Sequence, residues 1–202
     1  LNSDSQCSEG EEIYRSDEQG FYNLPKMTAA EGIDPQIISI GGTDIVTGKS
    51  FDSLALMAKI PADATKNITV TPLSTLLSIA DDPDALVESL GIDEGILAED
   101  LIDLDLWWLG TEAEDQAKDE MSAELSLSAG ALVSVVEKSM TLSVQIATLM
   151  QAADTAIPST TLGDVQSVQD RALMVTSSVV RQIESAWTEM ASEGGSPSLS
   201  NP

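Results

Sequence analysis

Histidine is absent from this chain of 202 residues, and basic residues are few: nine lysines and arginines stand against 34 aspartates and glutamates, giving a formal net charge of −25. Histidine is the side chain whose ordinary pKa lies closest to neutrality, so its absence removes the commonest general base and transition-metal ligand. The negative charge also repels nucleic acid and anionic lipid surfaces. The composition therefore disfavours most catalytic and nucleic-acid-binding functions and favours cations or basic partners.

Cysteine, aromatic residues and long hydrophobic runs are scarce as well. Cys7 is the only cysteine, so no internal disulfide framework can form. Aromatic residues make up 3% of the chain, too few for a sugar-stacking cleft, so a hydrolase acting through paired carboxylates is the weakest interpretation. The most apolar stretch, residues 125–150, is interrupted by Glu137, Lys138 and many hydroxyl side chains. We therefore expect no membrane insertion.

The sequence does contain enough apolar residues for a core, and its charge is concentrated in one segment. Hydrophobic residues make up 42% of the chain. Residues 81–120 carry fifteen acidic side chains and a single base, Lys118, whereas residues 121–192 are built mainly from Ala, Ser, Val, Leu and Met. This asymmetry predicts an acidic region followed by a weakly charged helical one.

The first 70 residues show the pattern of short strands. Hydrophobic segments separated by glycine and proline predict strands at residues 13–14, 21–22, 37–40, 51–57 and 68–71. We expect residues 1–70 to form a small antiparallel β domain resembling a β-sandwich, too small to be stable without a neighbour.

From residue 71 the hydrophobic period changes to that of helices. Thr71-Pro72 combines an N-cap hydroxyl with proline at the first helical position. Further helices are predicted at residues 84–90, ending at Gly91, and at 96–109, 127–150 and 162–191. The seam of the last helix packs either inside the bundle or against another copy of the chain. The sequence thus predicts an α+β protein, with an acidic, Ala/Ser-rich helical bundle over residues 71–192 and a flexible tail over 193–202.

The N-terminal segment has the ligand spacing of a calcium loop. If an aspartate preceded the first residue, four oxygen-bearing side chains would fall at positions three, five, seven and twelve of a twelve-residue loop: Asn2, Asp4, Gln6 and Glu11. Ser5 stands where such a loop has glycine. The alternative interpretation is a polar chain end without a metal.

A second acidic cluster lies beside two tryptophans. Asp100, Asp103 and Asp105 precede Trp107 and Trp108, which are candidate contacts for a protein partner. Spacings of two and three residues do not bring all three carboxylates to one helical face, so a solvated acidic face is the alternative.

Two shorter motifs carry weaker signals. Asn67-Ile68-Thr69 is an acceptor sequence for N-glycosylation in a secreted eukaryotic protein. Gly41-Gly42-Thr43-Asp44 lacks the lysine and the following helix of a phosphate-binding loop, so we interpret it as a tight turn.

Three segments occur in an order that resembles a known module. They are the turn DEQGFY at residues 17–22, the segment GGTDIVTG at 41–48 and the helix start VTPLSTL at 70–76. Together they resemble a repeat module of very large secreted surface proteins of marine bacteria, also found in algae. The resemblance implies a β unit like the carboxypeptidase-regulatory or adhesin-repeat domains, followed by an acidic helical region, in a non-catalytic, extracellular and often calcium-stabilised module.

Two functional hypotheses follow. The first is a structural or adhesive module at the cell surface or outside the cell, acting through contacts with copies of itself or with other chains, with Ca²⁺ as the candidate cofactor. The second is an acidic accessory subunit that docks onto a basic surface of a larger complex. No residue is assigned to catalysis in either hypothesis.

Overall fold

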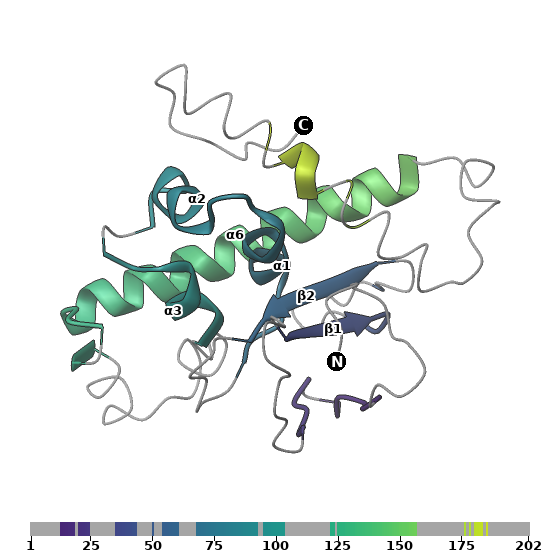
Figure 1. The fold of residues 1–202 in the computed structure, drawn as a ribbon, viewed down its shortest axis with the longest axis horizontal. Helices are drawn as coiled ribbons and strands as arrows, with labels where there is room; N and C mark the ends of the chain where they lie inside the picture. Colours follow the sequence, from purple (N-terminus) through teal and green to yellow (C-terminus); the bar gives the residue numbers. More distant parts are fainter. Residues whose placement is uncertain are drawn as a thin grey trace.

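A computed structural model describes residues 13–18, 20–24, 35–43, 50, 54–60, 68–92, 95–103, 122–123, 125–156, 176, 178, 180–183 and 185. A two-stranded antiparallel sheet, β1 (Gln36–Ile40) and β2 (Ala55–Lys59), precedes the helices α1 (Pro72–Ile79), α2 (Pro83–Ser89), α3 (Ala98–Asp103) and α6 (Ala129–Ala156). The predicted α+β class is therefore confirmed. Figure 1 shows β1 on the side of β2 that faces away from α1 and α6.

The two strands pair where the sequence alternates apolar and small residues. Ile38 pairs with Met57, and the register runs from Gln36 opposite Lys59 to Ile40 opposite Ala55. Gly41 and Gly42 follow β1 with φ angles of +72° and +105°, a backbone conformation that favours glycine. Gly41 N–H donates to the Leu54 carbonyl at 3.3 Å and Thr43 forms an isolated antiparallel bridge with Ser50, so the pairing continues past the two glycines. The tight turn expected at residues 41–44 includes Asp44, which lies with residues 45–49 outside the described residues.

Three predicted strands are not strands in the structure. Residues 13–14 and 21–22 flank a turn closed by Asp17, and Ile13 and Phe21 are 80% and 56% exposed. Among the described residues, β1 and β2 pair with each other and no strand pairs with these segments, so their β propensity alone does not make them strands. Residues 68–70 are held as a connecting segment, since the Tyr22 hydroxyl donates to the Ile68 carbonyl and Thr69 N–H donates to the Ile102 carbonyl.

Helix α1 begins as the sequence predicts. Thr71 is the N-cap and Pro72 the first helical residue. The Thr71 hydroxyl accepts from Ser74 N–H at 3.0 Å and the Ser74 hydroxyl accepts from Thr71 N–H at 2.8 Å, a reciprocal capping box with serine in place of the usual glutamate. The helix then buries Leu73, Leu76 and Leu77.

Helices α2 and α3 are short and are held by aspartates. The Asp82 carboxylate caps α2 by accepting from Ala85 N–H at 3.0 Å. The chain leaves α2 through Gly91, with φ of +65°, as predicted. Helix α3 covers only Ala98–Asp103 of the predicted helix 96–109, and residues 104–109 lie outside the described residues.

Helix α6 supplies the longest wall of the core. Leu132, Val135, Leu142, Ile146 and Met150 are buried against residues of α1, α2 and α3. The Lys138 ammonium donates to the Gly91 carbonyl and so ties α6 to the end of α2. Val180 and Ile183, from the region predicted as the last helix, join the same core, and residues 180–183 are helical.

Residues 129–152 of α6 are long and apolar enough to cross a membrane, with a mean hydropathy of 1.2, by length and composition alone. Glu137 and Lys138 are the two charges in this window, and its mean hydropathy stays high in spite of them. The expectation of no membrane insertion remains a prediction. In the structure, 39% of the window is buried inside the protein. One face of this helix therefore serves as a core wall.

Candidate functional site

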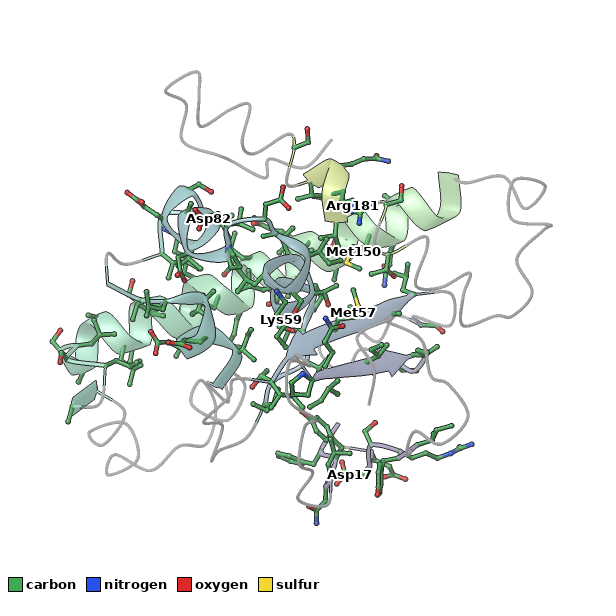
Figure 2. The ribbon with its side chains drawn as sticks, viewed as in Figure 1. Asp17, Met57, Lys59, Asp82, Met150 and Arg181 are labelled. Atoms are coloured by element: carbon green, nitrogen blue, oxygen red, sulfur yellow. The ribbon has the colours of Figure 1, made fainter. Side chains whose placement is uncertain are left out.

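The most distinctive arrangement in the structure is the edge of β2 that faces α1. Three backbone N–H groups along this edge donate to side-chain hydroxyls instead of to another strand. Met57 N–H donates to the Thr75 hydroxyl at 2.8 Å and Lys59 N–H to the Ser78 hydroxyl at 3.1 Å. Ala55 N–H donates to the Thr176 hydroxyl at 2.9 Å. Figure 2 shows Met57 and Lys59 on β2 beside α1.

One carbonyl of this edge, that of Met57, is also bound by a hydroxyl. The Ser74 hydroxyl lies 2.9 Å from the Met57 carbonyl oxygen and donates to it. We name the four side chains on this edge the hydroxyl row: Ser74, Thr75, Ser78 and Thr176. A hydroxyl both accepts and donates hydrogen bonds, so the row offers the acceptors and donors that the backbone of a third strand would supply. All four are buried, and Thr75 and Thr176 are fully so. The hydroxyl row therefore closes the inner edge of the sheet.

The outer edge of the sheet, on β1, is of the opposite kind. The N–H groups of residues 55, 57 and 59 on β2 point toward the hydroxyl row and therefore away from β1. In an antiparallel pair, residues directly opposite each other turn their backbone groups either both toward or both away from the other strand. The residues opposite these three on β1, which are 40, 38 and 36, therefore turn their backbone groups away from β2. Ser39 and Ile40 are exposed. The outer edge thus turns the backbone donors and acceptors of Ile38 and Ile40 away from β2.

Carboxylates in the described acidic region bind backbone N–H groups. The Asp84 carboxylate accepts from Ala98 N–H and the Asp100 carboxylate from Leu97 N–H, both at 2.8 Å, at the start of α3. Asp100 thus binds a backbone N–H three residues earlier in the chain. Asp103 is the last residue of α3, and Asp105 lies outside the described residues. Five acids on this side of the molecule are exposed: Asp81, Asp82, Asp84, Glu88 and Glu99.

The structure describes few of the side chains that the sequence analysis proposed as sites. The calcium candidates Asn2, Asp4, Gln6 and Glu11 lie outside the described residues, as do Trp107, Trp108 and Asn67. Among the residues that are described, no group of three or more Asp, Glu, Cys or His side chains is arranged to hold a metal ion. Figure 2 also shows Asp17 far from Asp82, so these two acidic segments form separate features.

The segment 13–24 is held together by one aspartate and one tyrosine. The Asp17 carboxylate accepts from Phe21 N–H at 2.9 Å, and Gly20, with φ of +86°, completes the turn predicted there. Tyr22 joins this segment to the rest of the protein through its bond to the Ile68 carbonyl. Burial raises the pKa of the Tyr22 phenol from 10.0 to about 12, because the charged phenolate loses hydration.

The hydroxyl row was missed by the sequence analysis, although a signal for it exists. Thr71, Ser74, Thr75 and Ser78 are spaced by three, one and three residues, which places four hydroxyls on one face of a helix. Such a face is too polar for an apolar core, and buried hydroxyls need partners. The pattern therefore indicates a helix that packs against backbone groups.

No family model matches this sequence, and no curated protein or solved structure is similar to it at a significant level.

Proposed function

We propose that this protein is a non-catalytic structural or adhesive module that acts outside the cell or at its surface, through contacts with copies of itself or with other protein chains. The observation that carries the proposal is the use of polar side chains in the described residues. The hydroxyl row and the carboxylates of Asp82, Asp84 and Asp100 all bind backbone groups of the chain itself. This use of polar groups supports a scaffold.

The resemblance of residues 17–22, 41–48 and 70–76 to secreted surface modules supports the extracellular location. Two of these segments have a structural role that is independent of the resemblance. Asp17 and Gly20 form the turn of the first segment, and Ser74 and Thr75 of the third bind the edge of β2. In the proposal, the small sheet belongs to a β-sandwich-like unit, and α6 with the last helix to an Ala/Ser-rich bundle.

Calcium is the proposed cofactor, held by Asn2, Asp4, Gln6 and Glu11. Thermal unfolding of the chain, extended upstream by about a dozen residues to complete a twelve-residue loop, tests it with Ca²⁺, with Mg²⁺ and with chelator at matched ionic strength. Binding to the folded state alone raises its stability by mass action, whereas charge screening acts with either cation. A rise with Ca²⁺ only, lost in Asp4→Asn and Glu11→Gln, supports the site. Equal unfolding temperatures in all three conditions would remove calcium from the function.

The exposed acids of α2 and α3 favour a second candidate, an accessory subunit that docks onto a basic protein surface. Asp81, Asp82, Asp84, Glu88 and Glu99 are exposed there, and residues 81–103 contain no lysine or arginine. Such docking is driven by charge and weakens steeply with salt. Sedimentation velocity tests the self-assembly of the first candidate: association of the protein with itself that persists in high salt supports it, and a monomer at every concentration leaves contacts with other protein chains.

A further inference from the structure

The outer edge of β1 has backbone groups that no described residue engages. The strand partners of Met57 and Ala55 are Ile38 and Ile40, whose N–H and C=O groups point away from β2. In the part of the chain that the structure describes, no further hydrogen bond involves either residue. An edge of this kind is a template for another strand.

This edge lacks three of the features that protect natural sheet edges. Edge strands are usually guarded by a charged side chain, a proline within the strand or a bulge. β1 has none of these: residues 36–40 contain no charge and no proline, and the register to β2 is unbroken. Residues 35–43 form a neutral segment in a chain of net charge −25. Within this segment two copies can approach without like charges facing each other, and the acids that bound it in the sequence, Asp34 and Asp44, make the approach depend on salt.

We propose that the outer edge of β1 pairs antiparallel with β1 of a second copy, around a twofold axis at Ser39. In this register Ile38 of one copy faces Ile40 of the other, and each such pair exchanges two backbone hydrogen bonds. The two Ser39 side chains, small and exposed in the single chain, lie directly opposite each other. A C₂ interface requires this self-complementarity, since the same residues serve both sides.

The pairing converts two marginal sheets into one stable sheet. Two-stranded sheets depend on their neighbours, whereas three or more strands with packed faces are stable. The inner edge of β2 is already closed by the hydroxyl row, so β1 is the edge at which this sheet can extend. The inference depends on the proposed function, because it names the surface through which that module assembles with itself.

The first test uses the unmodified 202-residue protein. Hydrogen exchange is measured by NMR at low and high protein concentration, in salt high enough to screen the net charge. We expect exchange of the Ile38 and Ile40 N–H groups to slow by about tenfold as the dimer forms, because these groups acquire acceptors. The N–H groups of Ile37 and Ser39, which point toward β2, serve as internal controls and change little.

The second test changes the edge. Ile40→Pro removes the outward N–H without removing a bond to β2, so we expect the dimer to weaken about thirtyfold through loss of two symmetric hydrogen bonds. Ile40→Val keeps the N–H and is the matched control. Sedimentation velocity gives the dissociation constant, and circular dichroism verifies the fold.

A charge pair at Ser39 tests the axis without altering the backbone. Ser39→Lys and Ser39→Asp each place like charges opposite one another, so each variant alone should dimerise about fivefold more weakly than Ser39→Thr. An equimolar mixture of the two places lysine opposite aspartate, and association should recover. Ser39 is exposed, so substitutions at this position should leave the fold intact. The charge pair therefore tests the β1 pairing even if Ile40→Pro does not fold.

The outcomes separate the inference from the proposed function. Association without protection of Ile38 and Ile40, or a mixture that associates no better than its components, overturns the β1 pairing and leaves self-assembly through another surface. A protein that stays monomeric in every condition overturns the pairing and the self-assembly together.

Discussion

Buried hydroxyls in the hydroxyl row and buried hydroxyls on α6 behave in opposite ways. Each member of the hydroxyl row binds a backbone group of β2, so the row takes the place of a missing strand. On α6, Ser139 is fully buried, yet its oxygen has no partner within the described structure. A helix face that carries hydroxyls therefore has one of two uses in this protein. Its hydroxyls bind backbone groups, or its side chains are used for their small size.

The exposed side of α6 makes the contrast sharper. Thr141 and Thr148 donate to carbonyls four residues earlier in the helix, at 2.8 and 2.9 Å. Ser139 makes no such bond, and the oxygen of Ser143, one turn later, is likewise buried and unpaired. An unpaired buried hydroxyl destabilises the folded state. The two regions therefore predict mutational effects of opposite sign.

The largest effect is expected at Thr75. Thr75→Val preserves the shape of the side chain but leaves the buried Met57 N–H without an acceptor, so the free energy of unfolding should fall by about 2–3 kcal/mol. Urea denaturation measures it. Thr75→Ser keeps the oxygen and loses one methyl group, a cost of about 1 kcal/mol. If valine were tolerated as well as serine, the hydroxyl row would not be closing the sheet.

A smaller loss is expected at the end of the row. Ser78 accepts from Lys59 N–H at 3.1 Å, and Lys59 is only partly buried, so water replaces the lost acceptor in part. Ser78→Ala should therefore lower the free energy of unfolding by about 1 kcal/mol. Ser89→Ala is the control, because Ser89 binds only the Leu86 carbonyl within α2. Equal denaturation midpoints for the two variants would argue against a role for Ser78 at the strand edge.

The same comparison defines how far the sequence predicts the structure. Local signals were sufficient for the start of α1 at Thr71-Pro72, the end of α2 at Gly91 and the turn at Asp17, because each depends on residues close together in the chain. Strand partners are not local. The segments at 13–14 and 21–22 have strand-forming residues, but no strand among the described residues pairs with them. By contrast, β2 extends to Lys59 because Gln36 of β1 lies opposite it.

The candidate sites show the same difference between local and long-range contacts. The spacing of Asp100, Asp103 and Asp105 predicted either a cation cluster or a solvated face, and the structure shows the Asp100 carboxylate accepting from Leu97 N–H at the start of α3. The spacing of the hydroxyls at residues 74, 75 and 78 indicates that this helix face needs backbone partners, but it does not identify β2 as the partner, since Met57 and Thr75 are 18 residues apart. Contacts of this range come from tertiary packing, which periodicity alone does not report.

A gain in stability is expected on α6. Ser139→Ala removes an unpaired buried hydroxyl and improves helix propensity, so the free energy of unfolding should rise by about 1 kcal/mol. Ser134→Ala, at an exposed position of the same helix, isolates the propensity contribution of about 0.5 kcal/mol. Chemical denaturation of both variants gives the difference. A loss of stability in Ser139→Ala alone would mean that this hydroxyl has a partner after all.

The smallest effect near neutral pH, and one that grows in alkali, is expected at Tyr22. Burial raises the pKa of its phenol from 10.0 to about 12, so below pH 10 the phenol is neutral in the folded and the unfolded state alike. Between about pH 10 and pH 12 the unfolded chain releases this proton while the folded protein retains it, so stability falls as pH rises through this window.

Tyr22→Phe should lose this part of the pH dependence, and Tyr14→Phe should keep it. Because the three proteins contain the same lysines and arginines, the difference between their denaturation curves at each pH isolates the phenol. Parallel curves for Tyr22→Phe and the unmodified protein would place the Tyr22 phenol in water, without its bond to the Ile68 carbonyl.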